Sequence, residues 1–197
     1  MSLKRILGFT LLLGVAAPAA ARADTLLMPF FGANIGGRSG RELARGIDAG
    51  RFDWGVSLAF MGAGILGLEA DVAYSPDFFG SSDIGGSSVL TATGNLVIGI
   101  PIGGQSGVGF RPYVLGGAGV IRSQVDALNP GLSVDQSEAA WDVGGGAMFF
   151  FANHVGLRAD LRYFRTFGRV NFDVIEIVER PQRLDFTRAS AALILRF

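Results

Sequence analysis

The sequence contains no cysteine, one histidine and a single lysine, Lys4. Without cysteine the chain can form neither a disulfide framework nor a thiolate metal site. Beyond residue 23, no apolar run reaches the roughly 20 residues that a transmembrane helix needs. That part of the chain keeps 17 − 3 = 14 arginines against 17 acids, a net charge of −3. This balance excludes the basic footprint of a nucleic-acid-binding protein, so we expect no nucleic-acid partner.

The first 23 residues have the composition of a secretory signal peptide. Lys4 and Arg5 form a positive start, an apolar run follows over residues 6–17, and the small residues Ala21 and Ala23 precede the expected cleavage site before Asp24. Such a leader is too short to span a membrane and is removed after export. We therefore expect a signal peptide over residues 1–23 and one exported domain over residues 24–197, of 197 − 23 = 174 residues.

The exported part is apolar for a secreted protein. Hydrophobic residues make up 49% of the chain, the mean hydropathy is +0.40, and 30 glycines are scattered without a repeat period. A chain that is exported, apolar and without a helical anchor can enter a membrane only as a closed β-barrel. The alternatives at this point are a periplasmic or an extracellular protein.

The end of the chain alternates between apolar and polar residues. A period of two places alternate residues on opposite faces of a β-strand. One face carries only apolar groups and the other carries arginines, which suits a barrel wall between lipid and a polar interior. The apolar face comprises Ala189, Ala191, Leu193, Leu195 and Phe197, and the other face includes Arg188, Ser190 and Arg196.

Seven further segments have the length or the alternation of strands. Each is about ten residues long, as a tilted transmembrane strand requires. The alternation is clearest in the second, third and seventh segments, whereas the glycine-rich fifth gives no firm face assignment. We expect strands near residues 25–35, 52–61, 66–75, 88–100, 110–121, 138–151, 155–165 and 185–197.

The connections between these strands alternate between long and short. Outer-membrane barrels have long outer loops and short periplasmic turns, and an even number of strands places both termini in the periplasm. The long connections are residues 36–51, 76–87, 122–137 and 166–184, and the short ones are 62–65, 101–109 and 152–154.

Aromatic residues gather at two heights in this arrangement, as in the interfacial belts of membrane barrels. The predicted fold is therefore all-β, an eight-stranded antiparallel up-and-down transmembrane β-barrel. Trp54, Tyr74, Trp141, Tyr163 and Phe186 fall near the expected outer ends of strands, and Phe60, Phe149, Phe151 and Phe197 near the periplasmic ends.

Three stretches resemble the small eight-stranded OmpA/OmpX-like outer-membrane barrels: residues 67–74, 111–114 and 155–163. The resemblance extends from about residue 25 to residue 197. It implies an outer-membrane location, and it implies that the aromatic terminal residue Phe197 is the assembly signal read by the barrel assembly machinery. Because the chain stops at the eighth strand, we do not expect the peptidoglycan-binding domain that full-length OmpA proteins append.

The polar strand faces place a set of charged residues inside the barrel. An eight-stranded barrel is about filled by its side chains, so these charges must be paired or hydrated. The pattern favours an ion-pair network that locks the barrel, with a charge-lined pore as the alternative. Because the third and seventh strands are not neighbours, we expect Glu69 and Asp71 to reach Arg158 or Arg162 across the lumen. The predicted network comprises Glu69, Asp71, Asp142, Arg158, Asp160, Arg162, Arg188 and Arg196.

Two features that suggest chemistry have plainer explanations. His154 lies in a turn expected in the periplasm without a serine beside it, whereas lipid A deacylase barrels of similar size use a histidine and a serine at the outer leaflet. The segment 62–67 matches a dinucleotide-binding fingerprint, but a strand follows it where that motif needs a helix. We therefore predict no catalytic, cofactor-binding or metal-binding residues.

The expected outer loops are where a specific function would reside. The first carries Arg38, Arg41, Arg45 and Arg51 against two acids. Arginine suits bidentate contact with phosphate, so this loop is either a lipopolysaccharide-contact loop or a solvated one. Partial alternation over residues 170–178 in the fourth loop suggests a protruding ribbon that binds an extracellular protein partner.

These observations favour a non-enzymatic outer-membrane protein with a structural, envelope-integrity role and loop-mediated binding, surrounded by outer-membrane lipids and needing no cofactor. A narrow channel for ions or small solutes is the main alternative, followed by a lipid A-modifying barrel enzyme. A lipocalin-like carrier would expose Arg158, Asp160 and Arg162 on one face while Trp54 and Trp141 crowd its lumen.

Overall fold

The computed structural model describes residues 24–35, 52–61, 64–76, 78, 87–103, 107–126, 133–167 and 184–197. The predicted signal peptide, the arginine-rich first loop and the predicted ribbon at 170–178 lie outside these residues. The described chain forms eight strands: β1 (Asp24–Ile35), β2 (Phe52–Met61), β3 (Leu66–Pro76), β4 (Ser87–Gly99), β5 (Gly109–Asp126), β6 (Ser133–Phe150), β7 (Val155–Thr166) and β8 (Asp185–Arg196).

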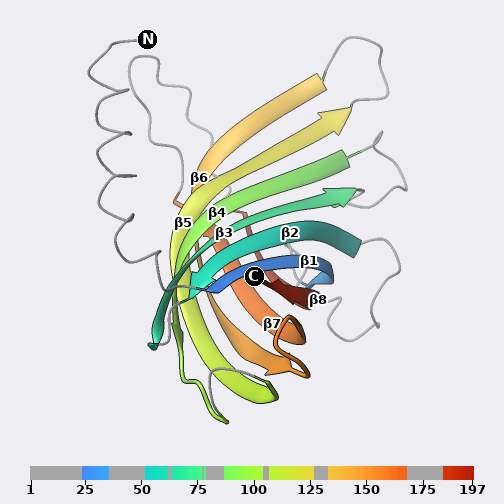
Figure 1. The fold of residues 1–197 in the computed structure, drawn as a ribbon. Coiled ribbons are helices and arrows are strands. Elements are labelled where there is room, and N and C mark those ends of the chain that lie inside the picture. The colour runs from blue at the N-terminus through green and yellow to red at the C-terminus, as the bar shows by residue number, and fades with distance from the viewer. Residues whose placement is uncertain are drawn as a thin grey trace, which may run out of the picture.

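The strands close into an antiparallel barrel in chain order, and β8 returns to pair with β1 (Figure 1). Asp24 and Phe197 lie at the same end as the short connections 62–65, 100–108 and 151–154, and we call this the turn end. The opposite end, where β1 and β2 are joined through residues 36–51, is the loop end. Among the described residues there is no helix with the length and apolarity needed to cross a membrane.

Two strands are longer than the sequence suggested. For the other six strands, the predicted bounds agree with the structure to within one residue. The prediction of a long connection over residues 122–137 is wrong, because β5 continues to Asp126 and β6 begins at Ser133 (Figure 1). Apolar alternation stops near residue 122, where Arg122 and Gln124 face outward, but the backbone pairing continues with Arg122 opposite Ser137. Hydropathy therefore marked the end of the apolar belt, not the end of the strands.

Alternation separates the two faces of the wall as predicted. On β3, Leu68 and Val72 are exposed while Glu69 and Asp71 between them are buried in the lumen. The same period holds in β2 and β7. An apolar exterior around a charged interior is the reverse of a water-soluble barrel and is the arrangement of a barrel in lipid.

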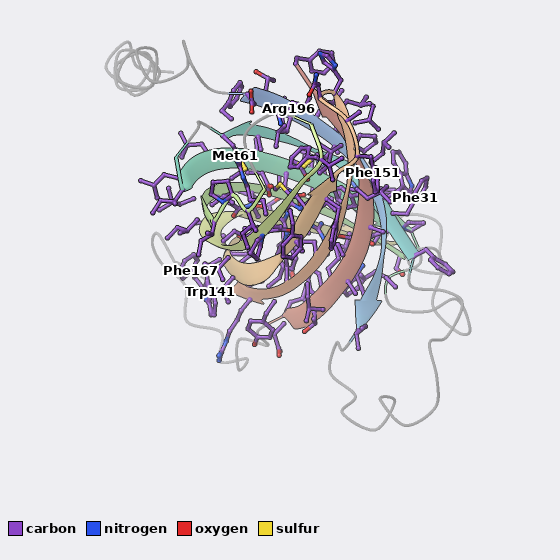
Figure 2. All side chains as sticks on the ribbon, turned by 60° about the horizontal axis from the view of Figure 1, so that its bottom comes forward. Phe31, Met61, Trp141, Phe151, Phe167 and Arg196 are labelled. Carbon is purple, nitrogen blue, oxygen red and sulfur yellow. The ribbon has the colours of Figure 1, made fainter. Side chains whose placement is uncertain are left out.

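Aromatic side chains form a belt at each end of the outer surface. At the loop end, Trp54 packs edge-on against Tyr74 and Trp141 packs against Tyr163, with ring centroids 5.9 and 5.8 Å apart. Figure 2 shows Trp141 on the outside of the barrel, and Phe151 lies outside near the turn end. The assignment of Phe186 to the outer belt is wrong: its side chain is 3% exposed. Phe186 lies at the height of the loop-end belt. It is two residues from Arg188 on β8, however, so its side chain points into the lumen as that of Arg188 does.

Two apolar layers fill the lumen above and below its charges. The loop-end layer is built around stacked rings of Phe164 and Phe186, 5.0 Å apart, with Phe78 edge-on to Phe186 at 5.1 Å. It comprises Phe78, Val89, Ile121, Ala140, Phe164 and Phe186. The turn-end layer includes Leu26, Met28, Met61, Val97, Met148, Phe150 and Ile194.

Candidate functional site

The candidate site is a charged layer in the lumen between these two apolar layers. It draws its members from β2, β3, β6, β7 and β8, and each side chain is buried. Five acids face three guanidinium groups, a formal charge of 3 − 5 = −2 if all are ionised. The members are Asp53, Glu69, Asp71, Asp142, Asp160, Arg158, Arg162 and Arg188.

Arg162 on β7 is the hub of the charged layer. Its Nη2 lies 2.8 Å from Glu69 Oε1, and its Nε donates to Asp160 Oδ1 at 2.5 Å. Its Nη1 lies 3.6 Å from Asp71 Oδ2 and 4.0 Å from Asp142 Oδ2. One guanidinium therefore faces four carboxylates and joins β7 to β3 across the lumen, as well as to the neighbouring strand β6.

Arg158 makes a second set of contacts nearer the turn end. Its Nη1 donates to Glu69 Oε2 at 2.5 Å and its Nη2 to Asp160 Oδ2 at 2.9 Å. Its Nε donates to the Tyr113 hydroxyl at 2.6 Å, and that hydroxyl donates in turn to Asp160. Glu69 therefore bridges two arginines, and Tyr113 connects β5 to the network.

Arg188 lies between aromatic rings near the loop-end layer. Its guanidinium is 4.8 Å from the ring centroid of Phe30 and 4.9 Å from that of Phe164, which are cation–π distances. Its Nη2 donates to Asp71 Oδ1 at 2.6 Å, and its Nε is 3.7 Å from Asp53 Oδ2. Both Asp53 carboxylate oxygens are buried without a hydrogen bond from the described residues.

Glycines on β5 and β6 make room for these large side chains. A Cβ at Gly144 would lie 2.8 Å from Arg162 Cγ, and one at Gly117 would lie 2.1 Å from Asn95 Oδ1. The Asn95 amide, oriented with its nitrogen toward Asp142, donates to both oxygens of that carboxylate at 2.9 and 3.1 Å. Its oxygen accepts from Arg162 Nη1 at 3.2 Å. Gly117 is paired with Asn95 and Gly144 with Arg162, so each glycine leaves room for the polar side chain of its partner on the neighbouring strand.

The structure brings together seven of the eight predicted network residues. Arg196 is the exception, because it lies at the turn end and pairs with Asp24, with Nε 3.2 Å from Oδ2. The predicted lipopolysaccharide-contact arginines lie outside the described residues. His154 is exposed in the turn 151–154, where its carbonyl oxygen accepts from the Arg196 amide at 2.9 Å. Gly64 and Ile65 lead directly into strand β3.

Several polar residues that contribute to the lumen were absent from the predicted network, among them Asp53, Tyr113 and Arg111. Asp53 lies on the same face of β2 as Ser57, whose hydroxyl donates to Asp71 Oδ2 at 2.7 Å. The alternation of β2 could therefore have placed Asp53 in the lumen. Tyr113 and Arg111 lie on β5, where glycines leave no alternation from which to assign a face.

Chemically, the charged layer is suited to holding strands together. Desolvating an ion costs several kcal/mol, and only good geometry with additional hydrogen bonds offsets that cost. Arg158 and Arg162 have that geometry, since each contacts two or more carboxylates. Within the described ranges, no three histidine, cysteine or carboxylate side chains are placed to hold a metal ion together.

A family model described as the outer membrane protein beta-barrel domain matches residues 7–197 of this chain. No curated protein matches the sequence. Solved structures with the same fold include Neisserial surface protein A, with 14% sequence identity and a TM-score of 0.62 over 88% of this chain and 97% of that one.

Two further similar structures come from other bacteria. Ail, the attachment invasion locus protein of Yersinia pestis, has 13% identity and a TM-score of 0.55, covering 89% of this chain and 99% of its own. OprG, an outer membrane protein of Pseudomonas aeruginosa, has 14% identity and a TM-score of 0.55, covering 89% and 96%. At these identities the likeness establishes the fold.

Proposed function

The chain belongs to the family of outer membrane protein beta-barrel domains, and from that premise we propose that it is a non-enzymatic, non-conducting barrel. Its role is to support the integrity of the envelope, and its loop end is the binding surface. The observation that carries the proposal is that buried apolar side chains cluster in the lumen on each side of the charged layer.

The two apolar layers oppose conduction through the lumen. An ion entering from the loop end would meet the buried, stacked rings of Phe164 and Phe186. An ion entering from the turn end would meet Met28, Met61 and Ile194, all of them buried. Exchange of ion-pair partners within the charged layer leaves both apolar layers in place, so it opens no water-filled path.

The proposed orientation places the turn end in the periplasm and the loop end outside the cell. A leader over residues 1–23 is removed before Asp24, and the barrel assembly machinery reads Phe197. The geometry of Phe197 supports recognition over packing. Phe197 is 75% exposed. Its backbone is hydrogen-bonded to β1, with its amide donating to the Thr25 carbonyl at 2.9 Å.

Binding at the loop end is proposed through two features. Arg38, Arg41, Arg45 and Arg51 lie in the connection between β1 and β2, where guanidinium groups suit the phosphates of lipopolysaccharide. The extended β5–β6 hairpin offers a second surface for an extracellular protein partner. No described strand pairs with β6 residues 133–138 on the β7 side, and a strand edge of this kind can accept an extended partner segment.

Single-channel recording in planar bilayers tests the non-conducting barrel. We expect no steady current steps from protein whose insertion is verified by heat-dependent gel mobility of the same vesicles. Uniform, long-lived steps would favour the narrow channel for ions or small solutes. Mass spectrometry of lipid A from cells with and without the protein separates the remaining alternative, because a lipid A-modifying enzyme adds or removes acyl chains.

A further inference from the structure

Buried polar atoms without a hydrogen-bond partner gather at one place in the lumen, on the loop-end side of the charged layer. Among the described residues there are six such side-chain atoms, and five of them belong to Asn34, Asp53 and Arg188. They are Asn34 Oδ1, both Asp53 carboxylate oxygens, and Arg188 Nε and Nη1; the sixth is Thr91 Oγ1. Each of the three residues is at most 4% exposed. Such atoms are rare in folded proteins, and a bound water or ion commonly accounts for them.

The three residues are neighbours on the lumenal face. Asn34 on β1 lies directly opposite Arg188 on β8, and Arg188 Nε is 3.7 Å from Asp53 Oδ2, too far for a direct hydrogen bond. Asp53 is paired with Gly32, where a Cβ would overlap Asp53 Oδ1, so the carboxylate leans toward β1. Asn34 Nδ2 donates to Ser75 Oγ on β3 at 2.8 Å, so its carboxamide crosses in front of β2. The unpartnered atoms of the three side chains therefore converge.

The lumen is polar on this side. The loop-end layer takes its buried members from Phe78 and from β4 to β8, and none of them lies on β1 or β2. At this end, β1, β2 and β3 instead carry Asn34, Asp53 and Ser75 into the interior. Toward the turn end, β1 carries the buried Met28. Several polar atoms on one side of an otherwise apolar interior provide the two to four partners that a buried water needs.

We propose that Asn34, Asp53 and Arg188 hold a bound water molecule that bridges the Arg188 guanidinium to the Asp53 carboxylate. The unpartnered atoms include two donors on Arg188 and three acceptors on Asn34 and Asp53. A cation would satisfy only the oxygens and would face Arg188, whereas an anion would satisfy only the nitrogens and would face Asp53. Water both donates and accepts, and it commonly bridges polar groups that are more than 3.5 Å apart. The inference does not depend on the proposed function or orientation.

The test uses the full barrel refolded in detergent micelles and records nuclear Overhauser cross-peaks between water and arginine Nε–Hε protons. The Arg188 signal is identified by its contacts with the Phe30 and Phe164 rings and by its loss in Arg188→Lys. We expect a cross-peak between Arg188 and water, with the rotating-frame sign of dipolar contact and not of proton exchange. Arg162 is the internal control, because its Nε donates directly to Asp160 Oδ1 at 2.5 Å and should show no water cross-peak.

Two matched variants separate a bridging water from general hydration of the lumen. Asp53→Leu and Asp142→Leu each remove one buried carboxylate and take the formal charge of the layer from −2 to −1. We expect the cross-peak between Arg188 and water to be lost in Asp53→Leu and kept in Asp142→Leu. The comparison of Arg188 with Arg162 in wild-type protein needs neither variant.

Three results would overturn the proposal. They are a missing Arg188 cross-peak in wild-type protein, an equally strong one at Arg162, and one that survives Asp53→Leu. An Arg188 signal that shifts and saturates with added sodium chloride would also contradict it, because an ion would then occupy the place given to water. None of these results bears on conductance, which tests the proposed function separately.

Discussion

Replacing Arg162 with methionine is the sharpest test of the charged layer. Arg162 faces four carboxylates, two of them within 2.8 Å, and its side chain is 2% exposed. Removing one member of a buried ion pair costs about 3–5 kcal/mol because the remaining charge is left unpaired. Arg162→Met also takes the formal charge of the layer from −2 to −3, so we expect a loss at the upper end of that range.

The matching change on the other side of the pair should cost less. Glu69→Gln takes the formal charge of the layer from −2 to −1 and leaves Arg158 and Arg162 both bonded to Asp160. We expect a loss of about 1–3 kcal/mol, the cost of weakened buried hydrogen bonds. In the double variant the losses should fall short of the sum by about 0.5–3 kcal/mol, as for residues in one network.

Equilibrium urea unfolding in lipid vesicles, followed by tryptophan fluorescence, measures these differences. Both tryptophans, Trp54 and Trp141, lie on the outer face, away from the substituted side chains. Arg165→Met is the control: Arg165 is half-buried at the outer face, and we expect a change within about 0.5 kcal/mol. Additive losses for Arg162→Met and Glu69→Gln, or a larger loss for Glu69→Gln, would contradict a network in which Arg162 is the hub.

Three further predictions follow from packing and from the end of the chain. Gly117→Ala should lower the unfolding free energy by about 1–3 kcal/mol because its Cβ would overlap Asn95, whereas Gly94→Ala, with open space around it, should be neutral in the same urea titration. Phe164→Ala should cost about 3–5 kcal/mol by removing a fully buried ring from the loop-end layer, and an unchanged urea midpoint would contradict that layer. Phe197→Ala should reduce the amount of barrel in the outer membrane of cells while refolding in vesicles stays normal; equal losses in both assays would show that Phe197 acts through packing.

The sequence was most informative where apolar and polar residues alternate strictly. On β3 and β7, alternate residues face lipid and lumen, so an outward Leu68 implies an inward Glu69, and Arg158 points inward in the same way. The contact between Glu69 and Arg158 across the barrel could therefore be predicted from the sequence. The physical reason is that a strand has only two faces, and a membrane barrel assigns lipid to one of them.

Other parts of the sequence contain less information about which side of the wall a residue faces. Glycines on β5 remove the alternation, so the inward positions of Tyr113 and Arg111 could not be read from it. Phe186 was misplaced because an aromatic residue near a strand end fits either a lipid-facing belt or a lumenal layer, and only parity separates them. The β5–β6 extension was missed because backbone pairing continues above the apolar belt, where side-chain hydropathy is no longer constrained.

Gel mobility of the outer-membrane fraction, boiled against unboiled in SDS, tests whether the protein is a closed barrel in the outer membrane. A closed barrel with lipid on its outer face and ion pairs within resists SDS when cold and runs compactly, and boiling unfolds it. We expect the protein in the outer-membrane fraction, with a band that shifts on boiling. Protein in the soluble periplasm with one unchanging band would contradict the assignment of lipid-facing and lumenal sides and would favour a soluble carrier.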